Sequence, residues 1–378
     1  MTFTAASSLD GTYPRPQLVR EHWCDLGGEW GFAYDDADAG QRDSWFAEAG
    51  AGAGADVTVF DRTIVVPFPP ESPASGIGDT GFHPVVWYRR TLTAQDVAAA
   101  GYVAAGGQGA GAGQGEGTRL ILNFGAVDYR ASVWVGGSLA GTHEGGGSPF
   151  SFDITDLLHD GADGTSVVVR AEDDPADLSQ PRGKQDWQLE PHVIWYHRTT
   201  GIWQPVWLEA VPSVAIESIH WTPELVDASV HARVRFSRPA APGSELSIAL
   251  DFDGRALGRV TIPAVGREAE VRIPLPEQRN GQAYEHLLWS PAHPRLVDAV
   301  VTLTAGAGAG AGAVAVDTVH SYLGLRSAEV AEGRFLLNDR PFYVRSVLNQ
   351  GYWPSTHLAA TAEMLRAEAQ LILDLGFN

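Results

Sequence analysis

Cysteine is almost absent from this chain: Cys24 is the one cysteine in 378 residues, so no internal disulfide can form. Structural disulfides belong to oxidising compartments, and their absence predicts a cytoplasmic location. Residues 1–10 hold neither a basic nor an apolar segment, so no secretory signal peptide is expected. Apolar runs of membrane-spanning length are also missing, and no membrane association is expected.

Basic residues are scarce as well. The 26 Lys and Arg stand against 46 Asp and Glu, which gives a formal net charge of −20. Nucleic acids and anionic surfaces are bound by basic patches, so no nucleic acid is expected as a partner. The charge favours a neutral or cationic partner.

Motifs for metal or nucleophile chemistry are missing too, since no H-E-x-x-H, G-x-S-x-G or phosphate-loop pattern occurs. The arrangement closest to a metal site is His192 and His197 beside Asp186, and its spacing matches no common ligand set. We interpret these histidines as structural and predict neither a metal nor a cofactor.

Short apolar segments of alternating pattern, separated by turn residues, fill the first part of the chain. Many short strands with turns between them are typical of a β-sandwich or jelly roll. We predict such a domain over residues 1–212. Its expected strands are 29–34, 63–70, 85–92, 119–124, 131–135, 165–170 and 206–211.

A second β domain is predicted over residues 213–322. About seven strands in roughly 100 residues is the size of an immunoglobulin-like β-sandwich. Asp253-Gly254 is a strong hairpin signal between two of them. The expected strands include 230–236, 246–252, 258–262, 270–275 and 297–303. Three Ala/Gly tracts, 49–55, 104–117 and 305–313, are predicted to be surface loops.

The last segment, 323–378, changes character. An apolar run at 342–348 is followed by a polar and aromatic turn and then by a helical pattern from about 357 to 375. A buried strand, a loop and an amphipathic helix form the first βα unit of a parallel barrel, here an incomplete (β/α)8 barrel. In such barrels the loops after the strands build the active site. Asn349, Gln350, Tyr352 and Trp353 are therefore candidate binding residues, although the two aromatics could instead fill a seam between domains.

The densest group of polar and aromatic residues lies between residues 170 and 203. A long loop held by two strands is a common place for binding residues. Sugars need carboxylates and amides for their hydroxyls and flat aromatic rings for their C–H faces. The alternative is a solvated loop that packs on the next domain through its tryptophans. The candidates here are Asp173, Asp174, Asp186, Trp187, Trp195, His197 and Arg198.

An ordered set of motifs in the chain resembles glycoside hydrolase family 2. Segments 67–72, 87–90, 122–128, 133–137, 145–155 and 200–209 resemble the sugar-binding domain of that family. Segments 288–291 and 335–341 resemble its immunoglobulin-like domain and the start of its barrel. The resemblance covers most of the chain and implies a jelly-roll sugar-binding domain, an immunoglobulin-like domain and a TIM barrel.

The resemblance also implies an activity and a departure from it. The family contains retaining β-galactosidases, β-glucuronidases and β-mannosidases, whose two catalytic glutamates lie on later barrel strands. Neither glutamate is present here, so we expect these 378 residues to be inactive alone. The resemblance adds Asp173 or Asp174, with Asp79 and His83, as substrate contacts.

Three interpretations remain open. The first is the N-terminal portion of a β-galactosidase-like retaining glycosidase that hydrolyses terminal β-glycosides in carbohydrate metabolism. The second is a carbohydrate-binding module without catalysis, and the third is an assembly module. The expected partner is a β-glycoside, and homo-oligomer formation stays open.

Overall fold

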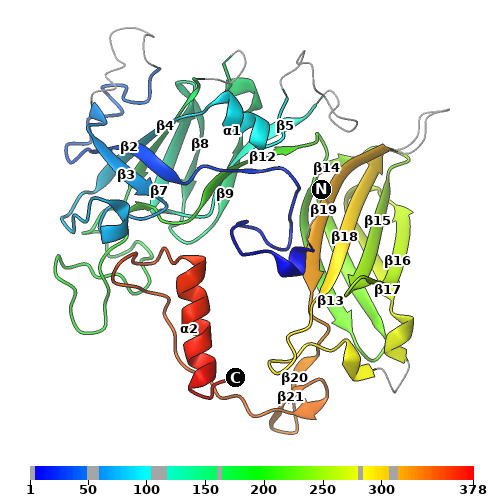
Figure 1. The fold of residues 1–378 in the computed structure, drawn as a ribbon. Helices are drawn as coiled ribbons and strands as arrows, with labels where there is room; N and C mark the ends of the chain where they lie inside the picture. The colour runs from blue at the N-terminus through cyan, green and yellow to red at the C-terminus, as the bar shows by residue number, and fades with distance from the viewer. Residues whose placement is uncertain (1–4, 49–58, 104–116, 160–163, 280–283, 306–313) are drawn as a thin grey trace.

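The computed structural model describes residues 5–48, 59–103, 117–159, 164–279, 284–305 and 314–378. The predicted Ala/Gly loops lie almost entirely outside the described residues. The fold is mainly β, as predicted, and consists of two antiparallel β assemblies side by side with a short C-terminal part below them (Figure 1). Neither of the two α-helices in the described ranges has the length and apolar character that crossing a membrane requires.

The first assembly contains two main sheets. The larger has the strand order β3-β2-β4-β10-β7-β8, the smaller has the order β1-β12-β5-β9, and a two-stranded sheet pairs β6 with β11. Helix α1 (Ala94–Ala99) begins at a Thr93–Asp96 capping box. The strands are β1 (Cys24–Asp25), β2 (Gly28–Tyr34), β3 (Arg62–Val66), β4 (Val85–Thr91), β5 (Arg119–Phe124), β6 (Val127–Asp128), β7 (Arg130–Val135), β8 (Ser138–Glu144), β9 (Phe150–Asp153), β10 (Ser166–Glu172), β11 (Gly201–Ile202) and β12 (Val206–Val211).

Strand β10 lies at the centre of this assembly and is buried on both faces. Val167 and Val169 point into the core between the two main sheets. Val168 faces the other way, where a second cluster forms around the stacked rings of Trp87 and Trp134, 5.4 Å apart. Burial on both faces explains why the sequence there is a continuous apolar run rather than an alternating one. It also makes β10 a rigid base for the loop that follows it.

The second assembly contains seven strands in the described part of the chain, the number that the sequence predicted. A three-stranded sheet, β13-β14-β17, packs on a four-stranded sheet, β16-β15-β18-β19, around one apolar core. Asp253 and Gly254 both have positive φ in the turn between β15 and β16, as a tight hairpin requires. The strands are β13 (Ile216–Glu224), β14 (Ser229–Ala240), β15 (Glu245–Phe252), β16 (Arg255–Pro263), β17 (Gly266–Pro274), β18 (Val297–Ala305) and β19 (Val314–Leu323).

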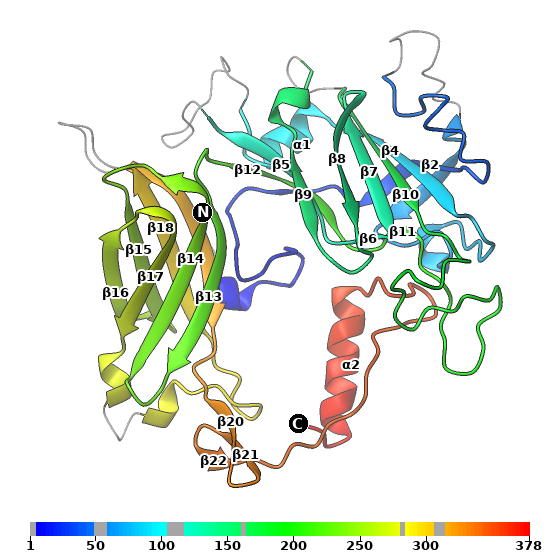
Figure 2. The same cartoon turned by 180° about the vertical axis from the view of Figure 1, so that it is seen from behind.

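Residues 6–20, called here the N-terminal strap, join the two assemblies, which the sequence did not predict. The strap runs along the edge of β19, where Val19 and His320 exchange two backbone hydrogen bonds of 2.8 Å. Leu18 enters the core of the second assembly. The chain then crosses to β1 in the first assembly (Figure 2). The strap therefore belongs to the packing of both.

The C-terminal part differs from the prediction. A small antiparallel sheet forms from β20 (Ala328–Ala331), β21 (Arg334–Leu337) and β22 (Arg340–Pro341). The predicted buried strand at 342–348 is wrong: this segment has no strand, and Tyr343 and Leu348 are 82% and 84% exposed. A strand needs a neighbour for its backbone hydrogen bonds, and no described strand lies beside 342–348.

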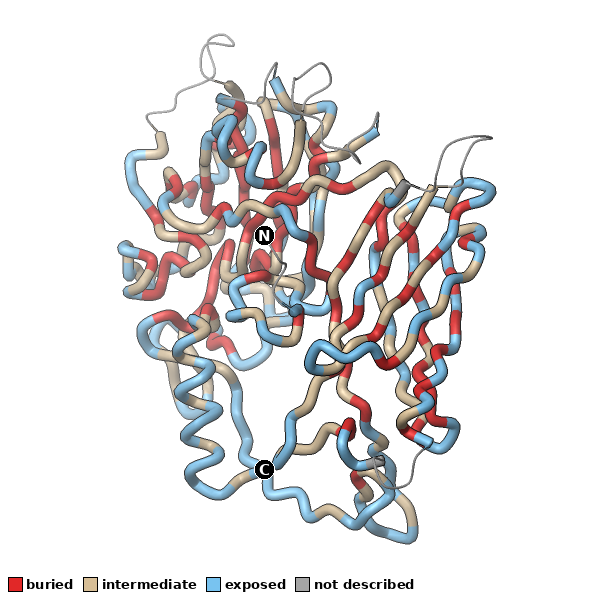
Figure 3. Tube along the Cα trace, turned by 45° about the vertical axis from the view of Figure 1, so that its right-hand side comes forward, coloured by how far each residue is buried: buried red, intermediate tan, exposed pale blue. Residues whose placement is uncertain are grey.

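The predicted C-terminal helix exists but is shorter than expected. Helix α2 (Ala362–Asp374) begins after Thr361, whose hydroxyl accepts a hydrogen bond from the Met364 N–H. His357, the expected start, has φ of +54° and pairs with Trp353 in a tight turn, so the helix cannot extend back to it. No residue of α2 is buried, as the exposure colours in Figure 3 show.

Candidate functional site

Residues 173–200, called here the polar loop, connect β10 to β11 and are buried at their base and exposed at their tip. Asp186 holds the tip in shape. Its carboxylate accepts hydrogen bonds from the backbone N–H of Gln188 and His192, at 3.0 and 2.7 Å, and contacts His192 Nδ1 at 2.6 Å. Desolvation alone would raise the pKa of Asp186, but these hydrogen bonds lower it below its ordinary value. His192 therefore has a structural partner, and the carboxylate of Asp186, a candidate binding residue, is engaged within the loop.

The base of the polar loop rests on three buried carboxyl groups, Glu71, Asp128 and Asp173, which we call the acid cluster. Asp173 is 5% exposed and forms an ion pair with Arg198 at 2.7 Å. Asp128 Oδ2 accepts from Gln185 Nε2 at 2.7 Å, and Glu71 Oε2 accepts from the Thr200 N–H at 3.2 Å. Each carboxyl thus contacts a different residue of the loop: Asp173 contacts Arg198, Asp128 contacts Gln185 and Glu71 contacts Thr200.

Burial dominates the electrostatics of the acid cluster. Desolvation raises the pKa of Glu71 to about 7. Desolvation, and next the charge of Asp173, raise the pKa of Asp128 to about 8. Asp128 Oδ1 is buried without a hydrogen-bond partner, which fits a neutral carboxyl better than an ionised one.

A stack of four rings joins the polar loop to the segment before α2. Tyr196 stacks on Tyr352 at 4.3 Å, Tyr352 on His357 at 5.2 Å, and His357 on His197 at 5.7 Å. Burial raises the pKa of Tyr352 to about 12 and lowers the pKa of His357 to about 4. Two regions that hold candidate binding residues are thus in contact.

The exposed tip of the polar loop presents two indole rings. Trp187 and Trp195 meet edge to face at 5.3 Å, and the Lys184 ammonium lies 5.4 Å from the Trp195 ring. Trp187 is 38% exposed, so its ring is available to a ligand. Asp174 is exposed and accepts a hydrogen bond from the Ala176 N–H at 2.8 Å.

His83 lies on the segment beside the base of the polar loop. Its ring stacks on Tyr34 at 3.7 Å, and its Nδ1 lies 2.8 Å from Asp36. Its neighbour Phe82 packs under the Arg198 guanidinium at 5.3 Å. His83 is therefore close to the acid cluster, although its own polar contacts are with other acidic residues.

Asn349 and Gln350 are exposed and line a hollow of about 420 Å³ with Tyr196, Tyr352 and the apolar face of α2. Asn349 Oδ1 accepts from the Gly351 N–H at 2.7 Å. Trp353 closes the turn onto His357 through backbone hydrogen bonds. This group adjoins the polar loop at the ring stack.

A second hollow, of about 410 Å³, borders the acid cluster at Asp128. Asp128 lines it together with Gln185, Trp203 and the glycines 145–147. Trp203 donates from Nε1 to the Gly146 carbonyl at 2.7 Å, which fixes the glycine turn. A carboxyl, an amide and an indole around a hollow of this size are suited to a polyhydroxylated ligand.

The candidates drawn from the sequence do not include Glu71, Asp128, Gln185, Tyr196, Trp203 or His357. Glu71 and Asp128 stand inside the quoted motifs, but nothing local marks them as buried carboxyls. In the described ranges, no three His, Cys, Asp or Glu side chains are arranged to hold a metal ion.

Fold and site together define a mainly β protein with a polar, aromatic-lined site at the end of its first sandwich. The same overall fold occurs in solved β-glucuronidases. The structure of the Lactobacillus rhamnosus enzyme matches with a TM-score of 0.67 at 19% identity, covering 96% of this chain and 55% of that one. The Bifidobacterium dentium enzyme in complex with coumarin-3-O-glucuronide also matches with a TM-score of 0.67 at 19% identity, covering 96% of this chain and 57% of that one. At these identities the likeness concerns the fold.

Sequence relatives extend this likeness, although no family model matches the chain. A β-galactosidase of Thermoanaerobacter pseudethanolicus is 24% identical over 275 residues, which is 69% of this chain and 33% of that protein. A β-glucuronidase of Canis lupus familiaris is 26% identical over 380 residues, which is 92% of this chain and 51% of that protein. Over most of its length the chain is therefore similar to proteins named β-galactosidase and β-glucuronidase, and it spans about a third of the first of these relatives and about half of the second.

Proposed function

We propose that the chain binds the terminal sugar of a β-glycoside at the polar loop and serves as the sugar-binding portion of a family 2 retaining glycosidase. The contact between Tyr196 and Tyr352 carries this proposal, because it brings the two predicted binding regions together. Trp187 and Trp195 supply apolar ring faces for the sugar, and Asp173 with the polar groups around it supplies partners for hydroxyls. The relatives named β-galactosidase and β-glucuronidase support the glycosidase class.

The charge of the site favours a neutral sugar such as a galactoside over a uronate. Asp128, Asp173 and Glu71 lie together, and the guanidinium of Arg198 is already paired with Asp173. Arg198 is therefore not free to neutralise a carboxylate on the ligand, which would lose its hydration there without that compensation. We therefore retain the β-galactosidase-like assignment.

We further propose that these 378 residues bind without hydrolysis. Retaining hydrolysis needs two carboxyl groups about 5–5.5 Å apart across the scissile bond. By resemblance these belong to later barrel strands, and residues 323–378 correspond to the start of that barrel. The domain limits 1–212, 213–322 and 323–378 belong to this proposal.

Calorimetric titration with methyl β-galactoside and methyl β-glucuronide tests the proposal. We expect saturable binding of the galactoside, weaker binding of the glucuronide, and no release of 4-methylumbelliferone from its β-galactoside. Trp187→Ala should weaken galactoside binding roughly three- to tenfold through loss of ring contact. Val226→Ala, at a 96% exposed position in the second assembly, is the matched control. Absence of binding by all glycosides tried would refute the proposal.

Two further expectations remain predictions. A cytoplasmic location rests on the scarcity of cysteine alone. Homo-oligomer formation is checked by sedimentation of the purified chain.

A further inference from the structure

The acid cluster has more buried acid than buried base. Glu71, Asp128 and Asp173 are each 5% exposed or less, and the guanidinium of Arg198, at 7%, is paired with Asp173. Three ionised carboxylates beside one cation would leave two negative charges without compensation in a desolvated place, which is costly. The cluster is therefore expected to retain protons that ordinary carboxyl groups lose.

The hydrogen bonds of the cluster hold the whole base of the polar loop. Asp173 binds Arg198 and Gln180, and Asp128 binds Gln185. Gln185 Oε1 in turn accepts from the Thr199 N–H at 2.7 Å, and the next N–H, that of Thr200, donates to Glu71. Gln185 and Thr200 thus tie the loop to carboxyls on other segments of the first assembly, and Asp173 ties parts of the loop to one another.

We propose that Glu71 and Asp128 are positioning residues that dock the polar loop while they are protonated, and that loss of their protons loosens the loop. The unpartnered, buried Asp128 Oδ1 is an independent sign that this carboxyl holds a proton. Thr200 of the loop donates to Glu71 from its backbone N–H and from its hydroxyl, and two neutral donors compensate a buried charge only in part. The inference concerns the loop itself and does not require that a sugar binds.

The other groups around the pair act in the same direction or are already engaged. Asp173 and Glu71 face Asp128 and disfavour its ionised form, while Arg198 favours it. Around Glu71 lie the rings of Tyr88, Tyr34 and Tyr352, all neutral near pH 7 because burial raises their pKa values. Arg182, which lines the hollow with Asp128, donates instead to the carbonyls of Pro175 and Asp177.

The sign of the effect follows from the raised pKa values. Stabilisation by a carboxyl with a raised pKa is complete below its ordinary pKa and is lost as the pH rises through its folded value. For Glu71 and Asp128 the folded values are about 7 and about 8. Docking of the loop should therefore be firm near pH 5 and weak near pH 9.

Hydrogen exchange at several pH values tests this, with rates corrected for intrinsic exchange. In the wild type we expect protection of the amides of residues 180–200 to fall about tenfold or more from pH 5 to pH 9. Amides of β14 and β15 should keep their protection, which separates loop release from global unfolding. Loop protection that is constant with pH, or an equal loss in β14 and β15, would overturn the inference.

Neutral variants supply the second measurement. Glu71→Gln and Asp128→Asn keep the shape of the side chain and cannot ionise. Each single variant should therefore lose less loop protection between pH 5 and pH 9 than the wild type. The double variant should lose none. Glu190→Gln, at an exposed position of the same loop, should behave like the wild type. A folded double variant that still loses protection between pH 5 and pH 9 would contradict the assignment. If the double variant does not fold, the wild-type comparison decides.

Discussion

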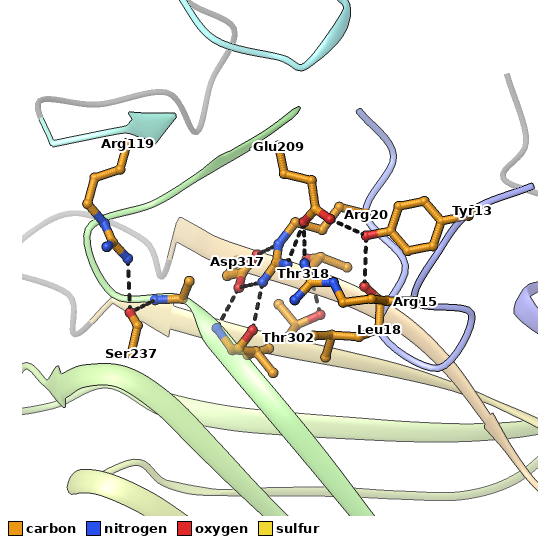
Figure 4. A network of polar contacts seen from close by, with 12 residues as sticks. Tyr13, Arg15, Leu18, Arg20, Arg119, Glu209, Ser237, Thr302, Asp317 and Thr318 are labelled. Carbon is orange, nitrogen blue, oxygen red and sulfur yellow. Dashed lines mark hydrogen bonds and ion pairs between the residues drawn. The ribbon is translucent and has the colours of Figure 1, made fainter. Parts of the chain in front are cut away.

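Arg20 and Asp317, 297 residues apart in the chain, form a bidentate ion pair between the N-terminal strap and β19. Nε lies 3.1 Å from Oδ1 and Nη2 lies 2.8 Å from Oδ2 (Figure 4). Arg20 also contacts Glu209 on β12 at 3.2 Å, so one guanidinium joins the strap to both assemblies. All three side chains are at most 7% exposed. This buried network makes the strap one of the connections between the two sandwiches.

Replacing Arg20 should destabilise the protein strongly. Arg20→Met leaves the carboxylate of Asp317 buried without its cation and removes one of the cations beside Glu209. Breaking a buried ion pair in this way lowers the free energy of unfolding by about 3–5 kcal/mol. Urea unfolding measures the loss. Arg42→Met is the control, because Arg42 pairs with Asp43 on the surface and should change nothing measurable. A loss for Arg20→Met no larger than for the control would show that the network does not stabilise the fold.

Stability should also fall in acid through Glu209. Desolvation acts to raise the pKa of this carboxyl, but Arg15 and Arg20 hold it below its ordinary value of 4.5. A lowered pKa gives stabilisation that is present above the ordinary value and is lost as the pH falls through the folded one. Urea unfolding at a series of pH values should show this decline below pH 4.5, and Glu209→Gln should have a flatter profile there. Identical slopes would contradict the prediction.

The ring stack should contribute to holding the segment before α2 against the polar loop. Tyr352→Ala removes one of the two inner rings of the stack. Each such ring pair contributes about 0.5–1.5 kcal/mol of stabilisation beyond that of the buried area. We expect faster hydrogen exchange in residues 352–360 and in the polar loop together. Tyr343→Ala, at an 82% exposed position of the same segment, is the control and should leave both unchanged. Faster exchange in one region alone would mean that the stack does not couple them.

Two adjacent glycines should differ sharply in their tolerance of alanine. A Cβ at Gly146 would lie 2.1 Å from Asp128 Oδ1, whereas a Cβ at Gly147 would meet nothing within 4 Å. Gly146→Ala therefore forces movement of the acid cluster and should cost about 1–3 kcal/mol, while Gly147→Ala should be tolerated. Thermal unfolding of the two variants makes the comparison, and equal midpoints would contradict the described approach of Asp128 to the glycine turn.

The sequence by itself determined most of the β structure. Val85–Thr91, Arg119–Phe124 and Val206–Val211 are strands where the apolar patterns predicted them, because a local pattern suffices when a strand has one or two buried faces. Asp253-Gly254 likewise determined its hairpin through backbone preferences alone. The density of polar and aromatic residues between 170 and 203 predicted a binding region at the polar loop.

Tertiary structure decided the rest. The apolar run at 342–348 has the composition of a buried strand, yet a strand forms only beside a partner that composition cannot supply. Glu71 and Asp128 are buried because segments distant in sequence cover them. Arg20 pairs with Asp317, which lies near the other end of the chain. Local sequence sets backbone preference and periodicity, whereas burial and charge pairing depend on which distant segments meet.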